Sequence, residues 1–328
     1  MKPISPALIP HVAWCLDETR AFIRLRGPAC VTFLQRLITC DVTHVTDDRS
    51  AWGALLTPQG RVLYDFFLVK EGDHGMLLEC HEAHRESLTT TLQRYRLGAQ
   101  LTIDRGDLVS AVIFGADEEA VTHHLPLNMP PPHVRHEGYD AVTRRHQDRI
   151  FYYDPRHRIG GVRVCQPHAM LSAFETMMTE RNVPRTALDV YTRFRLIHTL
   201  PQGIPDFESG VSLPLDNNMD SLHAISWDKG CYIGQEVTAR IKHRSKRRYH
   251  LRCFSLGDLP REALHAQDTT PLTLFYHGKE RGTLRHYQRP YGMALIRIDS
   301  PPLEGDGTEG AWRYDKTGHR LTYKEDGL

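Results

Sequence analysis

The residues best suited to chemistry stand in one short run, DKGCYIGQEVTAR, from Asp228 to Arg240. A thiolate is both a nucleophile and a metal ligand, which makes Cys231 the centre of the run. Its glycines allow unusual backbone angles, and residues 233–240 can form a short helix whose positive end lies just beyond the thiol. That helix end and the ammonium of Lys229 would both favour the thiolate. The run therefore predicts a reactive cysteine, the alternative being a small buried hydrophobic side chain.

The other cysteines give no sign of a second reactive centre. The chain has seven cysteines in 328 residues, and no two of them form a Cys-x-x-Cys pair. This odd, scattered set argues against a disulfide framework and against a self-contained zinc or cluster site.

Composition and charge narrow the class of protein. The chain has 41 Lys and Arg against 40 Asp and Glu, a formal net charge of +1, so nothing draws the whole chain to nucleic acid or membrane. No apolar run reaches the length of a membrane span, and prolines at 3, 6 and 10 interrupt the start before a signal peptide forms. We expect no Arg- and Ser-rich transit peptide before the domain. We expect no membrane partner and a cytoplasmic location, with the mitochondrial matrix as the alternative.

The elements that must position the motif alternate irregularly between strand and helix. Strands are expected over 20–26, 51–57, 61–69, 75–80, 139–143, 149–153 and 161–165, with two more around 106–107, and helices over 28–38, 82–97, 169–181 and 186–199. This order predicts an α+β fold with helices on one face of the sheets, not a doubly wound parallel sheet. Residues 129–132, with three prolines, predict a linker, and residues 201–228 a long ordered loop that carries function.

Beyond Arg240 the sequence changes character. Short apolar segments over 249–256, 272–276 and 293–298 are separated by Gly and Pro, which predicts an all-β terminal domain. We therefore expect two domains, 1–244 and 245–328.

A basic stretch, RIKHRSKRRYHLR, follows the motif over residues 240–252 and holds seven Lys or Arg. If it is extended, Arg240, Lys242 and Arg244 share one face. We interpret it as a solvated strand or an anion-facing rim, suited to a polyglutamyl tail or to an acidic protein. A nucleic-acid site is less favoured, because only Tyr249 interleaves the charges.

The motif KGCYIGQEVTAR resembles the signature of the YgfZ family, relatives of the glycine-cleavage T-protein (an aminomethyltransferase) that serve in iron–sulfur protein maturation. The resemblance covers nearly the whole chain and includes RLRGPACVTFLQRLITCDV, LLTPQGRVLYDFFLV, DPRHRIGGVRV and PQGIPDFESGVSLPLDNNMDSLHAISWDKGC. These segments are most similar to the branch that includes the mitochondrial iron–sulfur assembly factor and its bacterial counterparts.

This resemblance implies a T-protein-like fold, with two entwined α/β subdomains around a central channel and a C-terminal β-barrel. The T-protein holds tetrahydrofolate in that channel, and Cys231 would face the channel mouth. The candidate cofactor-binding residues are then Tyr64, Asp65, Arg195, Asp216, Lys229, Gln235, Glu236 and Arg240.

Two positions depart from the T-protein pattern. Its relatives carry an acidic pair after the hairpin turn, but Tyr64 and Asp65 leave one carboxylate here, which argues against aminomethyl transfer. Many relatives have a Glu at the position of Ile197 to pair with the pterin, and Ile offers no hydrogen bond. Asp216 or Asp206 could substitute. We expect weak tetrahydrofolate binding, which a Glu at position 197 would tighten if the pterin lies there.

The favoured function is iron–sulfur cluster assembly or repair, as an assisting factor rather than an enzyme, with Cys231 as the functional thiol. A [2Fe–2S] cluster takes four protein ligands, and one exposed cysteine supplies one of them. The expected partners are therefore an A-type iron–sulfur carrier, which shares the cluster, and iron–sulfur client proteins. The alternatives are a folate-dependent aminomethyltransferase, with Asp65 as its acid–base group and Cys231 structural, and an RNA-binding module that uses the basic stretch.

Overall fold

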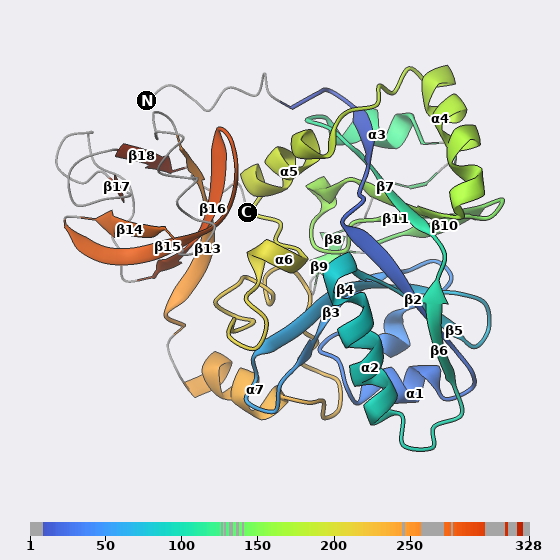
Figure 1. The fold of residues 1–328 in the computed structure, drawn as a ribbon, viewed down its shortest axis with the longest axis horizontal. Helices are drawn as coiled ribbons and strands as arrows, with labels where there is room; N and C mark the ends of the chain where they lie inside the picture. Colours follow the sequence, from blue (N-terminus) through green and yellow to red (C-terminus); the bar gives the residue numbers. More distant parts are fainter. Residues whose placement is uncertain are drawn as a thin grey trace.

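The computed structural model describes residues 9–125, 127, 129–130, 134–135, 138–139, 141–244, 247–256, 272–276, 278–298, 312–313 and 320–323 of the chain. These residues form two antiparallel sheets, a barrel and the helices that cover them (Figure 1).

The first sheet has the strand order β3–β4–β5–β2–β6 and is antiparallel throughout. Its strands are β2 (Arg20–Arg26), β3 (Ala51–Leu56), β4 (Val62–Lys70), β5 (Gly75–His81) and β6 (Thr102–Gly106). Helices α1 (Cys30–Gln35) and α2 (Arg85–Tyr95) cover its outer face, because their apolar side chains and alternate side chains of the strands form one buried cluster.

The second sheet has the order β1–β7–β12–β11–β10, again antiparallel. Its strands are β1 (Ala13–Leu16), β7 (Val109–Phe114), β10 (Thr143–His146), β11 (Arg149–Tyr153) and β12 (Val162–Gln166). Helices α3 (Glu118–His123) and α4 (Leu171–Glu180) pack on its outer face. A separate pair, β8 (Val134–Arg135) and β9 (Gly138–Tyr139), forms a small sheet of its own.

The chain passes from one sheet to the other and back. It begins in the second sheet with β1, builds the whole first sheet from β2 to β6, and returns with β7. Strands β6 and β7, which are neighbours in sequence, therefore lie in different sheets. This crossing entwines the two subdomains, as the resemblance implied.

The C-terminal strands close a barrel in the order β13–β16–β15–β14–β17–β18, drawn orange to red beside the sheets in Figure 1. They are β13 (Tyr249–Ser255), β14 (Thr273–Tyr276), β15 (Lys279–Gln288), β16 (Tyr291–Arg297), β17 (Trp312–Arg313) and β18 (Arg320–Tyr323). Helix α5 (Leu188–Ile197) joins the barrel to the sheets, since Tyr191 and Phe194 pack on β1 and β7 while Leu196 and Ile197 pack on β13 and β16.

The expected α+β class and the all-β end are confirmed, with differences in detail. Helix α3 and strands β1, β8, β15, β17 and β18 were not predicted. The strand expected over 139–143 meets only the end of β9 and the start of β10, and the loop over 201–228 contains α6 (Gly203–Asp206). Short 3-10 helices complete the elements: η2 (Val42–His44), η3 (Glu82–His84), η4 (Arg158–Gly160) and η5 (His168–Met170). Half of the proline linker, 131–132, lies outside the described residues. The domain boundary between 244 and 245 stays a prediction.

Candidate functional site: the exposed thiol and its supports

Cys231 lies on a loop, residues 228–234, that leads into helix α7 (Gln235–Arg244). All seven cysteines are among the described residues; six are buried and Cys231 is exposed. An exposed thiol is free to meet another molecule, whereas a buried cysteine behaves as a small apolar side chain. The structure therefore separates Cys231 from the other six by its exposure, and its reactivity stays a prediction.

Buried neighbours on both sides hold the thiol outward. Lys229 is 8% exposed, and its Nζ donates to the carbonyl oxygens of Ile38 at 2.8 Å and Cys40 at 2.7 Å. Tyr232 is 6% exposed and its ring belongs to the apolar cluster between the sheets. With the residues before and after it anchored in the protein, the side chain of Cys231 is left on the outside.

The observed bonds of Lys229 change the role expected for it. Burial lowers the pKa of its ammonium, and both hydrogen bonds go to backbone carbonyls of the segment after α1. The ammonium therefore fastens the loop to the first sheet's helical layer, a structural role that the sequence analysis did not foresee.

A close approach of two glycines fixes the loop against the hairpin of β3 and β4. Gly234 has φ +81°, and a Cβ built there would stand 2.6 Å from the carbonyl oxygen of Thr57. Gly60, at φ +71°, would place its Cβ 3.0 Å from the Cβ of Val237 in α7. Only glycine fits such contacts without strain, so the turn and the motif form one unit.

The remaining motif residues lie on α7. Glu236 and Arg240 form an ion pair, with 2.6 Å between Oε1 and Nη2, and both are exposed; Gln235 is half-buried. Exposed pairs of this kind contribute little to stability. These α7 residues follow Cys231 closely in sequence, whereas Lys229 is buried beneath the loop.

The basic stretch is not extended where it begins. Helix α7 runs to Arg244, so Arg240, Lys242 and Arg244 do not share the single strand face that the alternation suggested. The prediction overlooked that residues 235–244 contain no Gly or Pro and are rich in good helix formers. Residues 245–246 lie outside the described residues, and β13 begins at Tyr249.

Tyr64 and Asp65 point to opposite faces of β4, as neighbours in a strand must. The Tyr64 ring packs in the outer helical layer, beside His84. Asp65 is buried, and its two carboxylate oxygens accept from Trp52 Nε1 at 3.2 Å and from the backbone N–H of Gly203 at 2.9 Å. They cannot line one pocket together, and the Asp65 carboxylate already serves the fold.

Arg195 binds Asp206 at the junction with the barrel. Its Nη1 donates to Asp206 Oδ2 at 2.7 Å, and Nδ1 of His286, on β15, lies 2.8 Å from the other oxygen of Asp206. Burial acts to raise the pKa of Asp206, but the charges of Arg195 and His286 outweigh it and hold that pKa well below its usual range. Sequence reasoning missed His286, which lies 80 residues from Asp206 and in the other expected domain.

Two further positions proposed for the pterin serve the barrel interface. Ile197 packs with Leu251 and Met293 of the barrel in one apolar cluster, so a Glu there would lose its hydration among apolar side chains. Asp216 accepts from the backbone N–H of Tyr249 at 3.4 Å, and burial raises its pKa. That Ile197→Glu would tighten folate binding stays a prediction, and this apolar packing argues against it.

A buried charged network lies where the two sheets face each other. Glu79 of β5 accepts from Arg163 of β12 and Tyr152 of β11, and Arg163 also donates to Asp17 at 3.2 Å. Arg20 donates to the backbone carbonyl of Glu79 at 2.7 Å. All of these side chains are buried. In the sequence, a single Glu and a single Arg inside largely apolar strands are the signals of this network.

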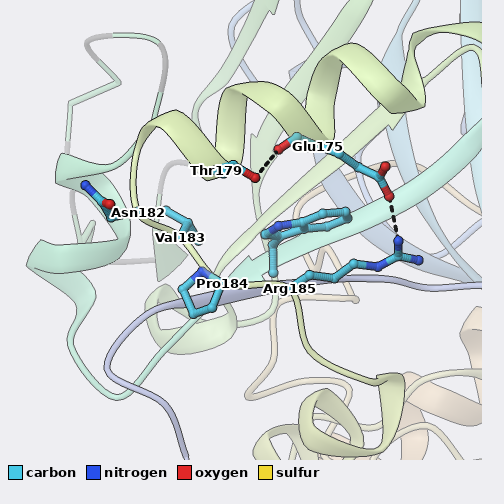
Figure 2. A pocket seen from close by; sticks show the side chains of 7 residues that line it. Glu175, Thr179, Asn182, Val183, Pro184 and Arg185 are labelled. Atoms are coloured by element: carbon cyan, nitrogen blue, oxygen red, sulfur yellow. Dashed lines mark hydrogen bonds and ion pairs between the residues drawn. The ribbon is translucent and has the colours of Figure 1, made fainter.

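A cavity of about 570 Å³ lies elsewhere, between α4 and the segment before α5 (Figure 2). Figure 2 shows Arg185 reaching Glu175, with 2.5 Å between Nη1 and Oε1. The same guanidinium lies 5.3 Å from the ring of Trp14. None of the predicted site residues lines this cavity.

The described residues contain neither a metal-binding cluster nor a membrane-spanning helix. No group of three His, Cys, Asp or Glu side chains in the described part of the chain could hold a metal ion. Within the same residues, no helix is long and apolar enough to cross a membrane.

No family model matches the chain, but comparison with known proteins finds relatives. The mouse (Mus musculus) "Iron-sulfur cluster assembly factor IBA57, mitochondrial" is 29% identical over 317 residues, covering 88% of this chain and 79% of that protein. The human (Homo sapiens) protein of the same name is 29% identical over 320 residues, covering 90% and 80%. Both names describe those proteins as mitochondrial. This fits the matrix alternative and does not support the cytoplasmic location expected from the sequence.

The fold also has a solved counterpart. The crystal structure of the glycine cleavage system aminomethyltransferase T from Bartonella henselae matches with a TM-score of 0.70 over 96% of this chain and 86% of that chain. At 15% sequence identity this likeness shows the fold alone. This chain is thus a homologue of the IBA57 iron–sulfur cluster assembly factors, relatives of the YgfZ family that its motif resembles, built on the aminomethyltransferase T fold.

Proposed function

We propose that this protein assists iron–sulfur cluster assembly or repair through the thiol of Cys231. The observation that carries the proposal is the exposure of this one cysteine, anchored on both sides, while the other six are buried. The names of the relatives support a role in iron–sulfur cluster assembly, and the thiol is a group that can bind iron. As a thiolate, Cys231 donates an electron pair to iron, and its proton passes to the solvent.

In this proposal the cluster is cargo shared with a partner. Cys231 is one ligand, and a [2Fe–2S] cluster takes four from protein. An A-type iron–sulfur carrier would supply the others, and client proteins would receive the cluster. The protein's own contribution is to hold one thiol at a fixed place on its surface.

Tetrahydrofolate fits the residues poorly. Both carboxylate oxygens of Asp65 accept hydrogen bonds from the protein, and Ile197 lies in an apolar cluster. The aminomethyltransferase alternative needs Asp65 as a free acid–base group, so it is disfavoured. We keep weak folate binding as a prediction and assign it no step.

The test is anaerobic reconstitution with an A-type carrier, followed by visible absorption of the cluster. We expect a chromophore with the unchanged protein and little with Cys231→Ser. The control is the double variant Gly230→Cys, Cys231→Ser, which keeps a thiol one residue away where a Cβ meets open space. It should restore less than the native thiol. Full cluster formation by Cys231→Ser would contradict the proposal.

A further inference from the structure

Helix α7 presents charges to solvent beside the thiol. Its Thr238 is buried, Val237 meets the hairpin turn at Gly60, and Ile241 packs against the apolar cluster between the sheets. This inner face fixes which side chains point outward. The exposed residues on the described helix are Glu236, Arg240, Lys242, His243 and Arg244.

The outward charge lies toward the C-terminal end. Arg240 is neutralised by Glu236 through their 2.6 Å ion pair. The ammonium of Lys242 lies 3.7 Å from the ring centroid of Trp227, a cation–π contact that holds the charge in place without cancelling it. Among the described residues Arg244 forms no ion pair. Two positive charges, Lys242 and Arg244, therefore remain on this end of the helix.

This surface is continuous with the loop of Cys231. Trp227 directly precedes that loop and carries Lys242 on its ring, while the loop's other end, Gly234, touches the β3–β4 turn. Figure 1 shows the end of that hairpin beside α7. At 1.5 Å per residue, Lys242 and Arg244 lie roughly 10–14 Å along the helix from its start. An interface of ordinary size, about 800 Å² per partner, spans that length.

We propose that the C-terminal half of α7 docks an acidic face of the protein that supplies the remaining cluster ligands. This inference rests on the proposed function and adds the chemistry of the partner. Carboxylates facing Lys242 and Arg244 would steer the encounter and fix its register, with the thiol near the same interface. The charge suits a protein better than RNA, because Lys242 covers one face of the half-buried Trp227 ring and α7 itself has no Phe, Tyr or Trp on which a base could stack.

The test measures association with an A-type carrier at low and at physiological salt. The double variant Lys242→Glu, Arg244→Glu should slow association about tenfold or more at low salt and weaken its salt dependence. The neutral variant Lys242→Gln, Arg244→Gln should fall between. The matched control, Arg94→Glu with Arg105→Glu, reverses two exposed charges on α2 and β6 and should change little.

The outcomes separate this inference from the proposed function. Cys231→Ser should associate normally yet form no cluster. If the charge-reversed protein associates as the native one does and still forms the Cys231-dependent cluster, docking on α7 is wrong and the proposed function stands. Loss of single-stranded RNA binding in that variant, with carrier association unchanged, would also overturn it in favour of nucleic acid. If the unchanged protein neither associates nor forms a cluster, both fail.

Discussion

Gly60 and Gly234 lie back to back, so that a Cβ built on Gly234 would stand 3.0 Å from the Cα of Gly60. One glycine belongs to the turn between β3 and β4, and the other precedes α7. Their contact joins the first sheet to the loop of Cys231. The position of the thiol therefore depends on a backbone contact between segments more than 170 residues apart in sequence.

Gly234→Ala should destabilise the protein by roughly 1–3 kcal/mol, because the new Cβ meets backbone and the positive φ suits glycine. Chemical denaturation measures the change. Gly230→Ala is the control: it lies in the same motif, and a Cβ there meets nothing within 4 Å. Its effect should stay within about 0.5 kcal/mol. Equal effects of the two substitutions would contradict the packing described here.

Alkylation should label one cysteine in the native protein. Burial raises the pKa of the Cys40 and Cys80 thiols to about 12, which adds to their lack of access. Iodoacetamide near neutral pH, read by mass spectrometry, should therefore modify Cys231 first. In guanidinium all seven should react. Cys231→Ser should abolish the native labelling with little change in stability, since the side chain is exposed. Early labelling of any other cysteine would mean that the fold opens there.

Ile197→Glu should destabilise the protein by roughly 3 kcal/mol or more without gaining folate affinity. The carboxylate would be buried among Leu251, Tyr291 and Met293, none of which carries a charge to pair with it. Ile197→Val is the control and should cost about 0.5–1.5 kcal/mol. Denaturation measures stability, and calorimetry with tetrahydrofolate measures binding. A stable Glu variant that binds folate more tightly would restore the pterin interpretation.

Features that depend on the local sequence pattern were predicted well. Strand β2 was predicted with its observed bounds, because apolar alternation ends there at Gly27. The exposed thiol was also anticipated. What the pattern does not contain is the partner of each buried polar group. Lys229 bonds carbonyl oxygens of residues about 190 positions earlier, and every residue has a carbonyl, so no residue type marks that contact.

The candidate functional residues that the resemblance implied fall into two groups, those close to Cys231 in sequence and those placed by tertiary contacts. Lys229, Gln235, Glu236 and Arg240 stay near Cys231 because they adjoin it in sequence. Asp65 and Arg195 instead both bind the segment 200–206, and Asp65 also accepts from Trp52. Whether a buried carboxylate is free or occupied is decided by tertiary packing, which composition and spacing do not reveal.

Asp206 should make the free energy of unfolding depend on pH in the acidic range. Its pKa in the folded protein lies well below its usual range, because Arg195 and His286 outweigh the effect of burial, whereas in the unfolded chain it is near 3.9. As pH falls below about 4, the unfolded state therefore takes up this proton first, and the stabilisation by Asp206 declines toward the folded pKa. Above about pH 5 this stabilisation is constant.

Asp206→Asn leaves Arg195 buried with its ion pair broken and should cost roughly 3–5 kcal/mol at pH 6. Urea denaturation of both proteins from pH 6 to pH 3 isolates this carboxyl from the other acids, since only the difference between them reports it. That difference should shrink below pH 4, and a constant difference would show that Asp206 carries no depressed pKa.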